Sequence, residues 1–128
     1  MFPRALAPIF AVGLLALAGC GPAKLDVTKT YTLDAGEPQI LFLDAQPKPQ
    51  TITVEFESSA SPITVLLIKD ADVPKDEDGF IPTSKAIAFK SGEKSATFSG
   101  DVPEKTASRV ILRNASSKTS VKVRVTNQ

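Results

Sequence analysis

The stretch "QTITVEFES", residues 50–58, decides the fold class of this chain. Apolar and polar residues alternate along it, which places Ile52, Val54 and Phe56 on one face of an extended chain and threonines and glutamates on the other. A period of two is typical of a half-buried β-strand. The stretch "TSVKVRVTN", residues 119–127, repeats the pattern with three valines. Each stretch therefore predicts a strand with one face in a hydrophobic core and the other in water.

Turn-forming segments rich in Gly, Pro, Asn and Ser divide the rest of the chain into short runs. Six further strands are expected at residues 29–34, 39–44, 62–69, 85–91, 94–100 and 108–114. The runs at 39–44, 62–69 and 108–114 are apolar on both faces, as expected of central strands. The turn "SGEK" at 91–94 is short enough to predict a hairpin. About eight strands at this spacing predict an all-β chain, a single β-sandwich of jelly-roll or Ig-like type, with a small β-barrel as the alternative.

Most phenylalanines beyond the N-terminal segment lie in the predicted strands, and one lies in a long loop. Phe42, Phe56, Phe89 and Phe98 lie within strand runs, where core packing is predicted. Phe80 and Ile81 lie instead in the one long connection, residues 70–84, where they either cap the core or present an apolar contact to a partner.

Charge is divided unevenly along the chain. Residues 20–84 carry 5 basic and 11 acidic side chains, whereas residues 85–128 carry 9 basic and 3 acidic ones. The first interpretation is that strands of the two halves lie side by side and neutralise each other. The alternative is a basic face turned toward anionic lipid headgroups, made of Lys90, Arg109, Arg113, Lys122 and Arg124. The near-neutral sum offers no general attraction to nucleic acid, which we do not expect as a partner.

The N-terminus reads as an export signal. One arginine, Arg4, precedes an apolar stretch of fourteen residues, Ala5 to Ala18, which is too short to cross a bilayer comfortably. A basic start, an apolar run and small residues at a cleavage point are typical of a secretory signal peptide. Residues 1–19 are therefore expected to form a signal helix that is removed.

The residues that follow carry a specific motif. Leu17, Ala18, Gly19 and Cys20 resemble the lipobox of bacterial lipoproteins, and Cys20 is the only cysteine of the chain. The resemblance implies cleavage between Gly19 and Cys20, a diacylglycerol group on the Cys20 sulfur, and acylation, with palmitate for example, of the new amino terminus. Two acyl chains hold a protein stably on a membrane. The alternatives for Cys20 are a buried thiol and half of an intermolecular disulfide.

This interpretation divides the chain into three parts. They are the signal peptide at 1–19, a tether at 20–27 that carries the lipidated cysteine, and the β-sandwich domain at 28–128. The expected location is the bacterial cell envelope, on the exported side and anchored in the membrane by acyl chains. The outer and the plasma membrane are not distinguished.

Catalytic chemistry is sparse in this sequence. The chain contains no histidine, which removes Ser-His-Asp and Cys-His nucleophiles and every histidine-containing metal site. Carboxylates in the 70–84 connection are the remaining candidates, because alternating carboxylates can converge on calcium. The candidate ligands are Asp70, Asp72, Asp76 and Asp78. A hydrolase that uses two of these carboxylates ranks third among the hypotheses.

The body of the chain also resembles a known domain type. "YTLDAG" at 31–36, and "ITVEFES" at 52–58 leading to "ITVLLIKDAD" at 63–72, are similar to bacterial pre-peptidase C-terminal-type β-sandwich domains. The glycine-tyrosine pair that this family usually has before a closing strand is missing from "ASRVILRNA" at 107–115. The resemblance implies an accessory or binding role without catalytic residues.

Together these observations predict a non-enzymatic lipoprotein that displays a β-sandwich for protein contact or structural support, with an envelope protein as partner and no cofactor. The alternative is an accessory module that binds calcium or another ligand through the acidic 70–84 loop.

Overall fold

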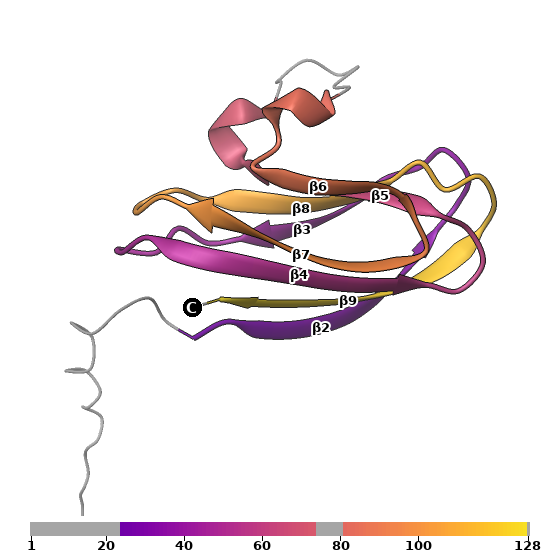
Figure 1. Cartoon of the computed structure of the whole chain (residues 1–128), viewed down its shortest axis with the longest axis horizontal. Helices are drawn as coiled ribbons and strands as arrows, with labels where there is room; N and C mark the ends of the chain where they lie inside the picture. The colour runs from indigo at the N-terminus through magenta and orange to yellow at the C-terminus, as the bar shows by residue number, and fades with distance from the viewer. Residues whose placement is uncertain (1–23, 74–80, 128) are drawn as a thin grey trace, which may run out of the picture.

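The computed structural model describes residues 24–73 and 81–127 (Figure 1). Within them lie eight strands: β2 (Asp26–Leu33), β3 (Gln39–Leu43), β4 (Gln50–Ser58), β5 (Ile63–Lys69), β6 (Ala88–Glu93), β7 (Ser95–Val102), β8 (Ser108–Arg113) and β9 (Thr119–Asn127). Two short 3₁₀ turns, η3 (Asp70–Asp72) and η4 (Thr83–Lys85), accompany them. No helix in the described ranges has the length and apolar character needed to cross a membrane. Each of the eight expected runs overlaps one strand, so the predicted strand positions are confirmed.

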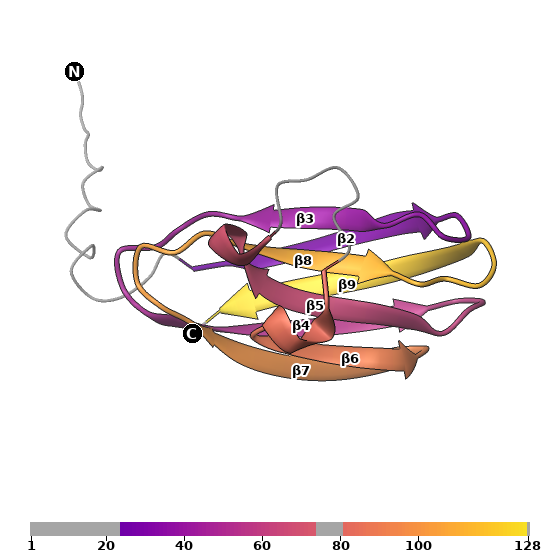
Figure 2. The same ribbon diagram turned by 90° about the horizontal axis from the view of Figure 1, so that it is seen from above.

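The strands form two antiparallel sheets that face each other (Figures 1 and 2). One sheet has the order β2-β9-β4-β7 and the other the order β3-β8-β5-β6. The all-β sandwich is therefore confirmed. The alternative of a small barrel is wrong, because the two sheets remain separate and each keeps its own edge strands.

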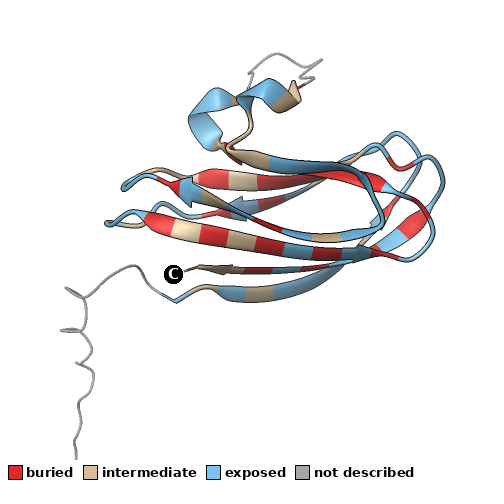
Figure 3. Ribbon diagram, in the orientation of Figure 1, coloured by how far each residue is buried: buried red, intermediate tan, exposed pale blue. Residues whose placement is uncertain are grey.

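The main core lies between the sheets and follows the alternation in the sequence (Figure 3). In β4 every second residue is buried, and Ile52, Val54 and Phe56 are at most 2% exposed. Strand β9 lies beside β4 and buries its three valines in the same way. Burying such side chains is worth about 1.5–3 kcal/mol each, so the alternating pattern of these two strands fixes which face of their sheet turns inward.

The chain passes from one sheet to the other at Lys94, between β6 and β7, instead of closing a hairpin. Strand β6 pairs with β5, whereas β7 pairs with β4 in the other sheet. The hairpin predicted for "SGEK" is therefore wrong. Gly92, with a positive φ of +72°, lies within β6 at the point where its pairing with β5 shifts register, a conformation that glycine adopts without steric cost. The crossing is tied down where the Ser58 N–H donates to the Lys94 carbonyl at 2.6 Å.

Gly100 allows the sheets to approach at this edge. A Cβ atom at this position would lie 2.7 Å from Cγ2 of Ile87 and 3.0 Å from Cδ2 of Leu67. Both side chains reach inward from the opposite sheet or from the chain leading into it. A residue with no side chain is therefore required here by packing.

The start of the domain lies at one edge of the sandwich. Strand β2 begins at Asp26, so the last two residues of the expected tether belong to the first strand. The Leu25 N–H donates to Oδ1 of Asn127 at 2.8 Å, which places the two ends of the described chain side by side (Figure 1). The expected signal peptide and the lipobox residues Leu17, Ala18, Gly19 and Cys20 lie outside the described residues.

Candidate functional site

The outer face of the β3-β8-β5-β6 sheet is unusually apolar. The strand register places Ile40 opposite Ile111, Ile111 opposite Leu66, and Leu66 opposite Phe89. These four side chains form one row that runs across all four strands. The row explains why the runs at 62–69 and 108–114 lack alternation: β5 and β8 are central strands with apolar residues on both faces, as predicted.

The middle of this row is a second, smaller core. Leu66, Ile68 and Ile111 are at most 3% exposed, although their side chains point away from the main core. The connection between β5 and β6 covers them, with Ile81 buried in the cluster and Val73 packed against it. The prediction that Ile81 caps a core is confirmed, and Phe80 lies outside the described residues.

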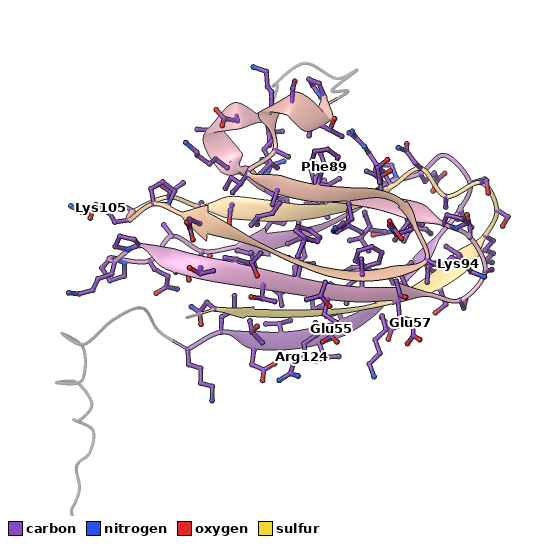
Figure 4. All side chains as sticks on the ribbon, in the orientation of Figure 1. Glu55, Glu57, Phe89, Lys94, Lys105 and Arg124 are labelled. Atoms are coloured by element: carbon purple, nitrogen blue, oxygen red, sulfur yellow. The ribbon has the colours of Figure 1, made fainter. Side chains whose placement is uncertain are left out.

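Both ends of the row reach the surface. Ile40 is 37% exposed, Phe42 is 64% exposed and Phe89 is 42% exposed. These are the exposed large hydrophobic side chains of the described residues, and all three lie on this one face. Figure 4 shows Phe89 on the side of β6 that faces the 3₁₀ turns.

The exposure of two of these residues corrects the sequence analysis. Core packing was predicted for four phenylalanines, and it is found for Phe56 and Phe98 but not for Phe42 and Phe89. The run at 39–44 was expected to be central, yet β3 is an edge strand. An edge strand has one neighbour instead of two, so its outward side chains are covered from one side only.

Arg109 links the exposed aromatic residue to the connection that covers the face. Its guanidinium carbon lies 4.9 Å from the centre of the Phe42 ring, within the range of a cation–π contact. Its Nε donates to Oδ1 of Asp70 in η3. Arg109 is therefore held from both sides, and it fixes η3 against β8.

The candidate calcium ligands are only partly described. Asp70 is paired with Arg109, and Asp72 is exposed in the same 3₁₀ turn. Asp76 and Asp78 lie outside the described residues. Among the residues that the structure does describe, no group of three or more His, Cys, Asp or Glu side chains converges as metal ligands would.

The outer face of the β2-β9-β4-β7 sheet has the opposite character. Its outward side chains are hydroxyls and charges, set in rows by the strand register. Arg124 of β9 lies opposite Glu55 of β4, and its guanidinium donates two hydrogen bonds to Asp26 of β2 at 3.1 and 3.0 Å. These bonds lower the pKa of the Asp26 carboxyl below its ordinary value and raise the pKa of Arg124. Here a strand of the N-terminal half lies beside a strand of the C-terminal half, and an acidic residue of the first pairs with a basic residue of the second, as the first interpretation expected.

The alternative of a single basic face is wrong. Lys122 and Arg124 are exposed on the outer face of one sheet, as their alternation predicted. Arg109 and Arg113 belong to β8 in the other sheet, and Lys90 belongs to its edge strand β6. Arg113 is partly buried, which lowers the pKa of its guanidinium.

A shallow hollow of about 700 Å³ lies on this polar face. It is lined by Asp26, Thr28, Glu55, Phe56, Glu57, Ser95, Ala96, Thr97, Lys122 and Arg124. Figure 4 shows Glu55, Glu57 and Arg124 along the same side of the sheet. This hollow was not predicted from the sequence. The alternating polar positions of β4 and β9 were visible, but the strand order that brings them together with β2 and β7 was not.

Comparisons with known proteins support the fold. No family model matches the chain, and no curated protein matches it by sequence. Among solved structures it is similar to a mitogen derived from Yersinia pseudotuberculosis, with a TM-score of 0.57 and 11% identity, over 81% of this chain and 86% of the mitogen. It is also similar to PliG of Aeromonas hydrophila, a periplasmic inhibitor of g-type lysozyme, with a TM-score of 0.54 and 16% identity, over 85% of this chain and 90% of the inhibitor.

Proposed function

We propose that this chain is a non-enzymatic, lipid-anchored envelope protein whose sandwich binds another protein of the envelope. The contact surface is the outer face of the β3-β8-β5-β6 sheet, defined by Ile40, Phe42, Phe89 and Arg109. The single observation that carries the proposal is that all exposed large apolar side chains of the described residues lie on this face, at its two edge strands β3 and β6. Exposed aromatic residues beside an arginine are the kind of side chain that contributes most to protein interfaces.

Two further observations support a protein contact. The chain contains no histidine, and its single cysteine lies in the lipobox-like segment. The domain that follows therefore contains neither a cysteine nucleophile nor a histidine base. The similar solved structures include a periplasmic inhibitor of g-type lysozyme, whose target is a protein. The anchor itself is proposed from the residues Leu17 to Cys20, and it would hold the domain within a short tether of the membrane.

The contact is tested by the size of the complex that mild detergent extracts from native membranes. The wild-type chain should migrate with a partner, and the variant Phe42→Ser with Phe89→Ser should migrate alone. Thr30→Ser with Thr32→Ser is the matched control, because both threonines are exposed on the opposite outer face. A complex of unchanged size in the phenylalanine variant would exclude this face as the contact surface.

The anchor is tested separately with Cys20→Ala. The variant should retain its signal peptide. Its mass should show that it carries no acyl chains, and it should no longer fractionate with membranes as a lipid-anchored protein does. An identical mass and identical fractionation would contradict the lipid anchor.

The alternative of a calcium-binding loop is tested by thermal unfolding with and without millimolar calcium. A ligand that binds only the folded chain must raise its melting temperature. No shift would remove this alternative, whereas a shift that Asp72→Asn abolishes would favour it.

A further inference from the structure

The hollow on the β2-β9-β4-β7 face contains polar groups that no neighbour engages. Elsewhere on this face the outward side chains bond to each other: Thr51 donates to Asp101 at 2.9 Å, and Thr53 and Ser99 share a hydrogen bond of 2.9 Å. Inside the hollow, Asp26 and Arg124 are paired, but several other lining side chains are not. Among the described residues, the following hollow side chains have no hydrogen-bond or ion-pair partner: Thr28, Glu57, Ser95, Thr97 and Lys122.

Glu57 and Lys122 do not form an ion pair, although their charges are opposite. Glu57 and Lys122 lie directly opposite each other in the ladder between β4 and β9. The two known ion pairs of the described residues involve Arg109 with Asp70 and Arg124 with Asp26. The carboxylate of Glu57 and the ammonium of Lys122 are therefore more than an ion-pair distance apart, and both are open to solvent.

The charges of the hollow favour a cation. Arg124 is already neutralised by Asp26 through two hydrogen bonds. The carboxylates of Glu55 and Glu57 and the ammonium of Lys122 remain, which leaves a net negative charge. Glu55 and Glu57 are two positions apart on β4, so their Cα atoms are about 6.5–7 Å apart and their side chains leave the same face. An ammonium group between two carboxylates at this spacing can donate a charge-assisted hydrogen bond to each.

The remaining groups define the rest of the ligand. Ser95 and Thr97 lie opposite Glu57 and Glu55 in the neighbouring strand β7, and Thr28 lies opposite Arg124 in β2. Their hydroxyl groups both donate and accept hydrogen bonds, which matches hydroxyl groups on a ligand. Within the described lining no aromatic ring presents a stacking platform to solvent, since Phe56 is 2% exposed. Binding must therefore rest on the charge and the hydrogen bonds.

From this arrangement we propose that the hollow is a binding site for a small, hydroxyl-rich primary amine, the chemistry of an amino sugar. The ammonium group binds between Glu55 and Glu57. The hydroxyl groups of the ligand bond to Ser95, Thr97 and Thr28, and Lys122 donates to a ligand oxygen. The site lies on the sheet opposite to the proposed protein-contact face, so it is independent of that function.

The test is a titration of the ¹⁵N-labelled full chain in detergent with D-glucosamine, followed by amide chemical shifts. D-glucose and N-acetyl-D-glucosamine are the controls for the hydroxyl groups, because they lack the charged amine. Butylamine is the control for the amine alone. We expect saturable shifts in β4, β7 and β9 with glucosamine, in the millimolar range that a small exposed site supports, and weaker or no shifts with the three controls.

Variants make the assignment specific. Glu57→Gln should weaken glucosamine binding about tenfold, which corresponds to the loss of roughly one charge-assisted hydrogen bond. Glu37→Gln removes an equal charge from an exposed loop outside the hollow and should leave binding unchanged. The dispersion of the amide spectrum shows directly whether each variant is folded.

Three results would overturn the proposal. They are the absence of saturable shifts with glucosamine, equal affinity for glucose, and wild-type affinity in a folded Glu57→Gln variant. Equal affinity for butylamine would overturn the sugar assignment, because the hydroxyl groups would then contribute nothing.

Discussion

The two outer faces of this sandwich differ in chemistry: one is polar and the other is largely apolar. On the β2-β9-β4-β7 face, strict alternation in β4 and β9 turns every second side chain to water as a threonine, serine or charged residue. On the β3-β8-β5-β6 face, β5 and β8 are apolar on both sides. An apolar sheet face is stabilised when it is covered, and here the described residues of the connection between β5 and β6 pack on its middle. The exposed apolar residues at the two edges of this sheet are therefore the part of the surface that packing among the described residues does not explain.

The largest expected effect is a difference in stability between a substitution under the covered part of the apolar face and one on the polar face. Leu66→Ala should lower the free energy of unfolding by about 2–5 kcal/mol, although its side chain points away from the main core, because it is fully buried under the β5–β6 connection. Thr30→Ala on the opposite outer face should change it by no more than about 0.5 kcal/mol. Urea unfolding of both variants measures the difference. Similar small effects in the two variants would show that the connection does not form a second core.

A somewhat smaller effect is expected where the two sheets meet. Gly100→Ala should destabilise the chain by about 1–3 kcal/mol, because its new Cβ atom would lie 2.7 Å from Cγ2 of Ile87. Ile87→Ala removes that methyl group, so the double variant should be more stable than the sum of the two single effects predicts. The measurement is a double-mutant cycle by thermal or urea unfolding. Strict additivity would mean that the contact does not limit the approach of the sheets.

The exposed Phe42, which lies beside the apolar row on β3, should respond differently. Phe42→Ala should change the free energy of unfolding by less than about 1 kcal/mol, because the ring is 64% exposed and contributes mainly through its contact with Arg109. Phe56→Ala in the core should cost about 3–5 kcal/mol. Unfolding curves for these two variants compare an exposed with a buried phenylalanine of the same chain. A large loss of stability in Phe42→Ala would make this ring a structural element rather than a contact residue.

The smallest effect concerns the ion pair of the polar face. The pKa of Asp26 should be lower than its ordinary value because of the hydrogen bonds from Arg124, and Arg124→Ala should return it to that value. A depressed pKa in the folded state stabilises the fold above the unfolded-state pKa, and this contribution disappears as the pH falls through the folded-state pKa. An NMR titration of the Asp26 carboxyl measures the shift, which we expect to be modest because the pair is exposed. An unchanged pKa in Arg124→Ala would mean that the ion pair is not formed in solution.

The strands were predictable from the sequence, and the pairing was not. Residues 50–58 and 119–127 carry their inward and outward positions in their alternation, so the positions of β4 and β9 and their buried faces followed directly. Alternation does not say which strand lies beside which. For this reason β3 was expected in the centre of a sheet although it lies at an edge, and the segment 91–94 was expected to close a hairpin although the chain crosses between the sheets there.

The candidate sites were likewise only partly predictable, because they too depend on which strands lie side by side. An apolar residue on an edge strand reads like a core residue in the sequence, so the exposure of Phe42 and Phe89 required the strand order. The hollow required four strands in register, with Thr28, Glu55, Thr97 and Lys122 brought together from distant parts of the chain. The apolar face was partly visible in the sequence. The runs at 62–69 and 108–114 do not alternate, which indicated strands whose two faces are both buried.

Photo-crosslinking in native membranes tests most directly whether the apolar outer face is the contact surface. A photoreactive phenylalanine analogue placed at Phe42, an exposed position next to Arg109, should give one discrete crosslinked species with an envelope protein. The same analogue at Thr30, exposed on the opposite face, should give none. Crosslinking at Thr30 with none at Phe42 would contradict the account, because the partner would then bind the polar face.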